Sequence, residues 1–319
     1  MSLTRLIILA TALAWAVVAL GAYVRLSGAG LGCPDWPGCY GHIGAPSGAE
    51  QQRAALAAFP DRPVEAPKAW KEMIHRYAAG TLGLLILAIF IGAWHEKRRA
   101  LRLSAVLLAL VAFQALLGRW TVTELLKPAI VSAHLLGGMA TLALLAWLAL
   151  ARGRFATGVE NGGALRVWAV LGLAAVAGQI ALGGWTSAHY AALACGDGLT
   201  CQGAWIPPMD FAGGFFGSAA TTQALTAIHW SHRVGALAVC AILAPLVVGL
   251  FRKRERHLGG LIAALIALQL GLGAANVALG LPLASAVLHN AVAAALLVAL
   301  VAANWKLAPS LFAKGEQRL

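Results

Sequence analysis

The chain has 319 residues, of which 60% are hydrophobic and only 11% are charged, whereas soluble domains carry about 25% charged residues. A mean hydropathy of +0.78 excludes an ordinary soluble globular protein, so most of the surface must face lipid. The net charge of +12 could indicate nucleic acid, but the basic residues gather in short loops between apolar stretches. That distribution excludes nucleic acid as a partner and favours anionic lipid headgroups.

In chain order, eight stretches are apolar and close to the length of about 20 residues that a bilayer-spanning helix needs. The first could instead be a cleaved signal peptide, but the internal repeat described below matches it to a stretch in mid-chain, which cannot be a signal. The predicted fold class is therefore an all-α integral membrane protein with eight transmembrane helices. The expected spans are Leu6–Val24, Ile74–Trp94, Leu103–Gly118, Ala129–Leu150, Val167–Ser187, Leu225–Leu250, Leu258–Leu279 and Leu283–Trp305.

Basic residues occupy every second connection and the C-terminus. Under the positive-inside rule this pattern places both termini in the cytoplasm and the long segments 25–71 and 188–222 outside, in a membrane of the bacterial inner type. Within the first long segment, residues 50–59 predict a short surface helix, which prolines 60, 63 and 67 then break. The basic clusters are Lys97, Arg98, Arg99 and Arg102; Arg152, Arg154 and Arg166; Arg252, Lys253, Arg254 and Arg256; and Lys306, Lys314 and Arg318.

Several cysteines, histidines, arginines and glutamines of the first half of the chain recur in the second half in the same order. Each half holds four predicted helices, so the repeat is parallel, and we expect two pseudo-symmetric four-helix bundles, 1–152 and 153–319. The polar, Gly-rich segment 152–166 would connect them. The matches are Cys33 and Cys39 with Cys195 and Cys201, shifted by 162 residues; His75-Arg76 with His232-Arg233, shifted by 157; and Gln114 and His134 with Gln269 and His289, shifted by 155.

Four histidines, His75, His134, His232 and His289, fall at broadly similar depth in the second and fourth helices of each half. Two histidines at one depth on facing helices can hold a haem iron from both sides, so the pattern predicts haem ligation. The alternative is that each is a hydrogen-bonded interhelical histidine. His229, on the same helical face as His232, is a rival ligand; the shared His-Arg context favours His232.

Glu72 precedes His75 by three residues and shares its helical face, whereas the matching position in the second half is His229. A carboxylate there could act as a general base or stabilise a developing cation. We therefore expect the first half to be catalytic and the second to hold a structural or electron-transfer cofactor. The alternative role for Glu72 is an ion pair with Arg76. Arg76 and Arg233 could pair with haem propionates, or simply anchor their helices.

The cysteine pairs Cys33/Cys39 and Cys195/Cys201 each enclose five residues in predicted outer loops, where disulfides persist. Zinc fits poorly because the spacing is wrong and the loops offer few other ligands. The pairs are either loop-closing disulfides or strained, redox-active ones, and the residues do not decide between these. Cys240, in mid-helix, is expected to be an inert core residue.

These residues resemble the haem A synthase family over essentially the whole chain. The segment 21–39, Gly-Ala-Tyr-Val-Arg-Leu-Ser-Gly-Ala-Gly-Leu-Gly-Cys-Pro-Asp-Trp-Pro-Gly-Cys, is similar to the first outer loop of that family. The combination of Cys-Pro-Asp-Trp-Pro with Glu-x-x-His-Arg is specific, although neither motif alone would be. Further matches are Glu72-Met-Ile-His-Arg76, Phe113-Gln-Ala-Leu-Leu-Gly118, Ser231-His-Arg233 and His289.

The resemblance implies an enzyme that converts haem O to haem A for terminal oxidases, by oxidising the C8 methyl to a formyl group through hydroxylations with oxygen from water. It implies that His232 and His289 ligate a resident haem b, that His75 and His134 flank the substrate haem, and that Glu72 is the essential acid. The haem O-producing enzyme and a second copy of the chain are expected partners. Nothing in the sequence identifies the electron acceptor.

Two other functions fit part of the pattern. A di-haem cytochrome b, which moves electrons between quinol and a periplasmic acceptor, needs the same histidines but has no need for Glu72, and it would hold two equally tight haems. A transporter with a repeat architecture would use the histidines as proton relays. Paired outer cysteines and His-Arg motifs are not expected there, and such a protein would be colourless.

Overall fold

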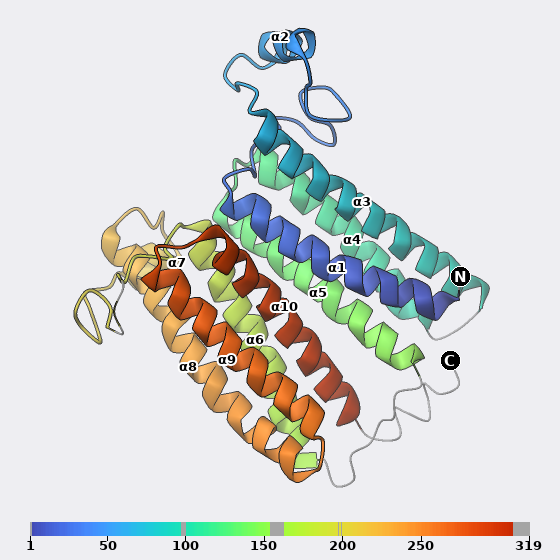
Figure 1. Ribbon diagram of the computed structural model, residues 1–319, viewed down its shortest axis with the longest axis vertical. Coiled ribbons are helices and arrows are strands. Elements are labelled where there is room, and N and C mark those ends of the chain that lie inside the picture. The colour runs from blue at the N-terminus through green and yellow to red at the C-terminus, as the bar shows by residue number, and fades with distance from the viewer. Residues whose placement is uncertain (1, 97–99, 154–162, 197, 199, 309–319) are drawn as a thin grey trace. The chain divides into compact units, whose positions relative to one another are not determined.

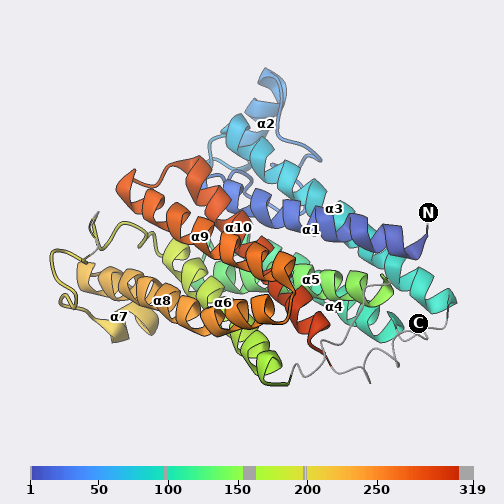
Figure 2. The ribbon, with the colours of Figure 1, turned by 60° about the horizontal axis from the view of Figure 1, so that its bottom comes forward.

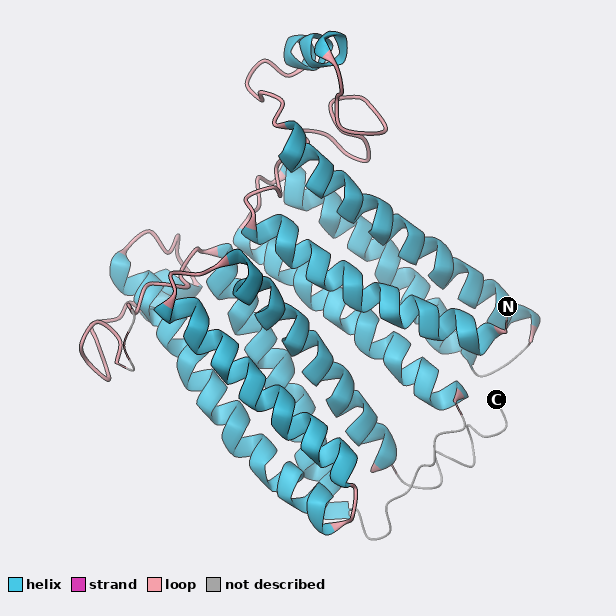
Figure 3. Ribbon diagram, viewed as in Figure 1, coloured by secondary structure: helices cyan, strands magenta, loops and turns pink. Residues whose placement is uncertain are grey.

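The computed structural model describes residues 2–96, 100–153, 163–196, 198 and 200–308 (Figure 1). These residues form helices joined by loops and two isolated backbone bridges, with no named strand among them (Figure 3). The helices are α1 (Leu3–Leu26), α2 (Ala49–Ala58), α3 (Ala66–His95), α4 (Ala100–Thr123), α5 (Pro128–Arg152), α6 (Gly163–Ala188), α7 (Phe211–Phe215), α8 (Thr222–Arg252), α9 (Arg256–Ala278) and α10 (Leu283–Lys306).

The all-helical fold and the eight predicted spans are confirmed. Eight of the described helices, all except α2 and α7, are long and apolar enough to cross a membrane. The short helix predicted at 50–59 is present as α2. Of the basic clusters, Lys97, Arg98, Arg99, Arg154, Lys314 and Arg318 lie outside the described residues, and the orientation of the chain stays a prediction.

The largest difference from the predicted bounds is at α3, which starts at Ala66, eight residues before its predicted start, and has 30 residues. Helix α8 starts at Thr222, three residues before its predicted start, and has 31 residues. At about 1.5 Å per residue, each is roughly 45 Å long, whereas the hydrocarbon core is about 30 Å thick. Pro67, expected to break helical structure, lies in the first turn of α3, where its missing N–H leaves no bond unmade. The early start of α3 places Glu72 within the helix, next to the loop that precedes it, whereas His229 already lay in the predicted span.

The chain folds as two compact units, residues 1–141 and 142–319, with the boundary inside α5. In the first unit α3 packs against both α1 and α4. In the second, α6, α8, α9 and α10 pack in a closed ring, and the short α7 lies on α8 (Figure 2). Residues 154–162 of the predicted linker lie outside the described residues. The predicted symmetry between the halves, and the roles assigned to them, stay predictions.

Each cysteine pair ends in the same tight turn. Backbone bridges join Cys39 to His42 and Cys201 to Ala204. The two residues inside each turn have positive φ, 54° and 76° at Tyr40 and Gly41, and 52° and 80° at Gln202 and Gly203. Positive φ at both central positions is typical of the type I′ hairpin turn, which the glycine favours. The turn directly follows the second cysteine of each pair and reverses the chain there.

Candidate functional site

The first cysteine loop, residues 33–39, is closed by a Cys33–Cys39 disulfide and lies on the start of α3. Glu72 Oε2 accepts a 2.9 Å hydrogen bond from the Cys33 backbone N–H. The Arg76 guanidinium donates to three loop carbonyls, those of Asp35 at 2.9 Å, Pro37 at 3.3 Å, and Gly38. One turn of α3 therefore binds both ends of the loop.

The first cysteine loop also packs against α3 through buried side chains. Cys33, Cys39 and Tyr40 form a buried cluster with Ala69 and Met73 of α3. The Tyr40 hydroxyl donates to the Pro63 carbonyl at 3.1 Å, and burial raises the pKa of this phenol above its usual value of 10.0. Asp35 accepts hydrogen bonds from the Tyr40 and Gly41 N–H groups at 2.6 and 2.8 Å. These contacts fix the surface that covers Glu72.

The second cysteine loop, residues 195–201, repeats this arrangement on α8. A disulfide joins Cys195 to Cys201, and the Cys195 N–H donates to His229 Nδ1 at 3.2 Å. Arg233 donates to the Gly198 carbonyl at 2.6 Å and to that of Thr200 at 3.2 Å. Loop residues 197 and 199 lie outside the described residues. The cysteine pairing in both loops is confirmed, and the open question of redox activity stays open.

The two loops differ in the residue that holds the first cysteine. Glu72 is 5% exposed, and its Oε1 accepts from Arg76 Nη2 at 2.5 Å, so the ion pair weighed as an alternative from the sequence is present. His229, a neutral acceptor when it takes the Cys195 N–H, occupies the same place in the second unit. A buried carboxylate one turn before a candidate ligand is thus found on α3 and not on α8.

Arg76 and Arg233 contact loop carbonyls instead of pointing free toward a cofactor. The contacts of Arg76 with the loop and with Glu72 occupy both of its terminal nitrogens, and those of Arg233 with the loop do the same. Pairing of either arginine with a haem propionate stays a prediction. Sequence reasoning missed the loop-clamping role, although the recurrence of a His-Arg motif after each cysteine pair is a signal for it.

His232 on α8 and His289 on α10 face one another in the second unit. Their ring centroids are 6.4 Å apart, with the ring planes at 71°. Two imidazoles that coordinate one metal ion from opposite sides, with bonds of about 2 Å, have centroids roughly 6 Å apart. The pair therefore has the spacing that a bis-histidine haem requires. No cluster of three or more His, Cys, Asp or Glu that could hold a bare metal ion occurs within the described part of the chain.

His75 on α3 and His134 on α5 are the corresponding histidines of the first unit. Both Nδ1 atoms are buried, and neither has a hydrogen-bond partner among the residues that the structure describes. Burial of a ring nitrogen without a hydrogen-bond partner costs free energy of folding unless a ligand or an ordered water binds that nitrogen. Both rings are thus available to a ligand, which fits the predicted substrate site.

A glycine lies against the ring edge of every one of the four histidines. A Cβ atom at Gly21 of α1 would be 3.0 Å from His75 Cε1, and one at Gly183 of α6 would be 3.2 Å from His232 Cε1. The same contact occurs at Gly118 with His134, at 3.5 Å, and at Gly273 with His289, at 3.3 Å. These glycines repeat at the cysteine and glutamine offsets of 162 and 155 residues, a signal that sequence reasoning did not use.

Among the residues that the structure describes, glutamine hydrogen bonds are found at the second pair of histidines and not at the first. Gln179 Nε2 lies 3.0 Å from His232 Nδ1, and Gln269 Nε2 lies 3.1 Å from His289 Nε2. The latter contact has to break if that nitrogen is to coordinate iron. Gln114, the first-half match of Gln269, is buried instead against Gly137, and its Nε2 has no partner within the described ranges.

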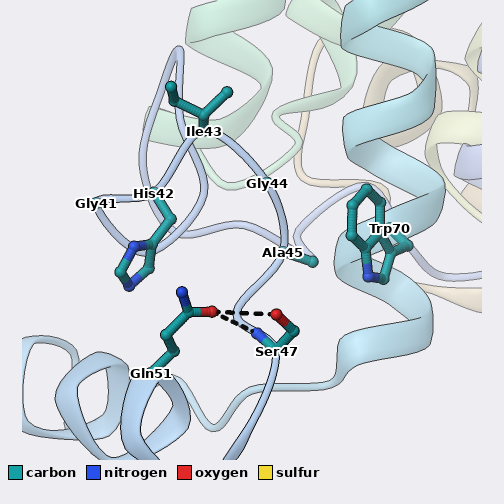
Figure 4. A pocket seen from close by; sticks show the side chains of 8 residues that line it. All are labelled: Gly41, His42, Ile43, Gly44, Ala45, Ser47, Gln51 and Trp70. Atoms are coloured by element: carbon teal, nitrogen blue, oxygen red, sulfur yellow. Dashed lines mark hydrogen bonds between the residues drawn. The ribbon is translucent and has the colours of Figure 1, made fainter.

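The remaining candidates lie away from these pairs. His229 is buried with Nδ1 engaged by the loop, which weakens it as a rival ligand. Cys240 is a free, half-buried thiol. A hollow of about 490 Å³ is lined by residues 41–47 and by one residue each of α2 and α3, and Figure 4 shows Gln51 hydrogen-bonded to Ser47 beside it. None of the four histidines nor Glu72 lines it, so we assign it no chemistry; its lining is Gly41, His42, Ile43, Gly44, Ala45, Ser47, Gln51 and Trp70.

Comparison with known proteins identifies the family of this chain. The family model COX15-CtaA, described as a cytochrome oxidase assembly protein, matches residues 4–301. A protein of Shewanella oneidensis named heme A synthase is 42% identical over 322 residues, which cover 96% of each chain. Proteins of the same name from Caulobacter vibrioides and Halalkalibacterium halodurans are 29% and 27% identical, over 92% and 76% of this chain and 93% and 74% of their own. The chain belongs to the haem A synthase family of cytochrome oxidase assembly proteins.

Proposed function

We propose that this protein is a haem A synthase that oxidises the C8 methyl of haem O to a formyl group. The observation that carries the proposal is that two histidine pairs stand in one chain, while a buried carboxylate accompanies only the first pair. A protein that only transfers electrons does not need a carboxylate beside one of its two haem sites. An enzyme in which only one haem reacts does need such a group at that site. The near full-length similarity to proteins named heme A synthase supports the same reaction.

In the proposed reaction, the methyl group and one water yield the formyl group, four protons and four electrons, through a hydroxymethyl stage. The oxygen comes from water, and the electrons leave to an external acceptor. His75 and His134 would flank the substrate iron from either side of the porphyrin, with Gly21 and Gly118 admitting their rings. The half-buried placement of these histidines between apolar helices suits a substrate that carries a farnesyl tail.

Glu72 would act on the methyl carbon or on the attacking water. Withdrawal of electrons from a methyl group conjugated with the porphyrin leaves positive charge, which a fixed carboxylate stabilises. The same carboxylate can accept a proton from water as that water attacks. Arg76 and the Cys33 N–H hold both carboxylate oxygens, so the group is oriented before substrate binds.

In the second unit, His232 and His289 would hold a resident haem b. The distance between their ring centroids suits two ligands on one iron. When bound there, haem b supplies a one-electron redox centre. Gly183 and Gly273 lie against the two rings and leave room for them. His229, in place of a carboxylate, leaves this site without a fixed negative charge beside the loop.

The proposed setting is the cytoplasmic membrane of a bacterium, with both termini inside and both cysteine loops outside. The alternation of basic loops supports this orientation, and the two disulfides suit an oxidising compartment. Haem O is insoluble in water, so direct transfer from the enzyme that produces it, and association between copies of this chain, are consistent with the proposal.

The test is to extract and chromatograph the haems of the purified protein, expressed with and without a supply of haem O. The proposal expects haem b alone without the supply, and haem b with haem A or its hydroxylated precursor when haem O is present. Two equivalents of haem b under both conditions would instead identify an electron-transferring cytochrome b. A colourless protein under both conditions would exclude both functions.

A further inference from the structure

The segment between Cys201 and α8, residues 202–221, exposes several large apolar side chains outside the membrane-spanning helices. Trp205 is 74% exposed, Ile206 77% and Phe216 93%, and Phe211 is exposed as well. Exposed apolar residues that occur singly need no explanation, whereas a group of them marks contact with a protein or a membrane. The segment takes no part in the proposed chemistry, so its surface indicates a separate interaction.

The same segment is almost free of charge. Its one charged side chain, Asp210, is used inside the segment, because it accepts a hydrogen bond from the Gly213 N–H at 2.8 Å and caps α7. The matching segment of the first unit, residues 40–65, packs both of its aromatic side chains, Tyr40 and Phe59, into the buried cluster on α3. That segment also has five charged residues, which are Glu50, Arg53, Asp61, Arg62 and Glu65. The first segment therefore suits water, and the second does not.

Contacts with α6 and α8 hold the segment in place. Phe215 packs against the buried cluster that contains Ala224 and Ile228 of α8. The Trp185 indole N–H, at the end of α6, donates to the Gly214 carbonyl at 2.9 Å. Helix α7 thereby lies against the start of α8 (Figure 1). The exposed apolar side chains are thus presented by a backbone that the second unit fixes.

Trp230 of α8 indicates the depth of this segment. Its indole N–H donates to the Trp205 carbonyl at 2.9 Å, and its ring centroid lies 6.2 Å from that of Phe211. Trp230 precedes Arg252, at the basic end of α8, by 22 residues, which is roughly 33 Å of helix. The hydrocarbon core is about 30 Å thick. In the proposed orientation, Trp230 and the segment bound to it therefore lie where the outer acyl chains meet the headgroups, a boundary that tryptophan favours.

We propose that residues 205–216 enter the outer leaflet of the bilayer, where Trp205, Ile206 and Phe216 contact lipid headgroups and the upper acyl chains. Lipid is favoured over a protein partner for two reasons. The segment lies at the depth of the bilayer boundary without a free charge, and it continues the lipid-facing surface of α8, on which Leu237 is 68% exposed. The proposal rests on the proposed orientation of the chain and not on the haem chemistry.

A lipid-bound segment would fix how deep the second unit sits, because aromatic anchors at the boundary set the depth and tilt of the helices that carry them. His232 follows Trp230 by two residues, so the same anchor would set the depth of the predicted haem b ligand. In the first unit, the charged helix α2 would stay in water.

The experiment attaches a nitroxide to one introduced cysteine, Ile206→Cys or Phe216→Cys, in the purified full-length protein. Both variants also carry Cys240→Ala, which removes the free thiol, and labelling without reductant leaves the two disulfides intact. The protein is placed in nanodiscs of phosphatidylethanolamine and phosphatidylglycerol. Electron paramagnetic resonance then measures collisions of the nitroxide with oxygen, which concentrates among acyl chains, and with a nickel chelate, which stays in water.

Two further labelled sites calibrate the measurement. Leu237→Cys, on the lipid-facing surface of α8, gives the ratio of oxygen to nickel collisions among acyl chains, and Leu56→Cys, on the exposed and charged α2, gives the ratio in water. Intact disulfides by mass and a single elution peak show that each variant is folded.

We expect the ratio at 206 and at 216 to exceed that at 56 and to approach that at 237. A ratio equal to that at 56 would overturn the proposal, because the segment would then lie in water. Low collision rates with both reagents would also overturn it, since a protein surface, such as a second copy of this chain, would then cover the segment. Neither outcome would change the haems that the protein yields, so failure here is distinct from failure of the proposed function.

Discussion

Replacement of Glu72 by glutamine isolates the charge of the buried carboxylate. The amide keeps one oxygen that can accept from the Cys33 N–H, which lies at 2.9 Å in the native structure, and it keeps the side chain's volume. Arg76 loses its 2.5 Å ion pair but retains the carbonyls of the first cysteine loop. The folding penalty should therefore be about 1–2 kcal/mol, below the roughly 3–5 kcal/mol of a buried charge left without any partner.

The effect on the reaction should be much larger. Loss of one preorganised group that stabilises transition-state charge commonly lowers the rate by about 100- to 1000-fold. We expect Glu72→Gln to retain haem b, to bind haem O, and to accumulate haem O or its hydroxylated form in place of haem A. Haem extraction and chromatography from cells that supply haem O give all these quantities in one assay.

The matched control is Glu65→Gln on the residue that precedes α3. Glu65 is exposed and forms a 2.8 Å ion pair with Lys68, and such surface pairs contribute about 0–1 kcal/mol. It should leave the haem products unchanged. Resistance of the Cys33–Cys39 disulfide to reductant should match between Glu72→Gln and the parent protein, which shows that the loop has stayed in place. A normal yield of haem A from Glu72→Gln would refute the role of this carboxylate.

The other predictions concern the rings, the first loop and its disulfide. Gly183→Ala places a methyl 3.2 Å from the His232 ring and should lower haem b occupancy and alter its absorbance spectrum, while Gly178→Ala, which meets nothing within 4 Å, should do neither. Replacement of both Cys33 and Cys39 by serine opens a short loop and should lower stability by about 2 kcal/mol, seen as a lower Tm in detergent with haem b retained. Burial raises the pKa of Tyr40, so the stabilisation from this side chain is complete below about pH 10, the pKa of tyrosine in the unfolded chain, and is lost as the pH rises through the pKa of the folded state. Tyr40→Phe removes the hydrogen bond to Pro63 and should lower stability by about 1 kcal/mol, but it should also remove this loss at alkaline pH. Unfolding measured as a function of pH tests both effects.

Composition and periodicity were enough to predict the spans, because a lipid-facing helix must be apolar along most of its length. The start of α3 was predicted less well. Its first turns are polar and contain Pro67, as a loop would, and the first cysteine loop packs on them. Those turns position Glu72, so the least predictable part of the helix is the part that matters for chemistry.

The internal repeat predicted the histidines and cysteines but not how they are held. Hydrogen bonds from Arg76 and Arg233 to loop carbonyls depend on the backbone path of the loops, which residue types alone do not specify. The contact of Gln179 with His232 was missed because the first half has Val17 at that position, so comparison of the halves does not mark the residue as repeated. A search for differences between the halves would have found it.

The central claim is that one chain holds two haem sites with different roles. Its most direct test compares the haems extracted from two double variants, made with haem O supplied. The account predicts that His232→Ala with His289→Ala loses haem b. It also predicts that His75→Ala with His134→Ala keeps haem b and yields no haem A. Equal loss of the same haem from both double variants would contradict it, because the two sites would then be equivalent.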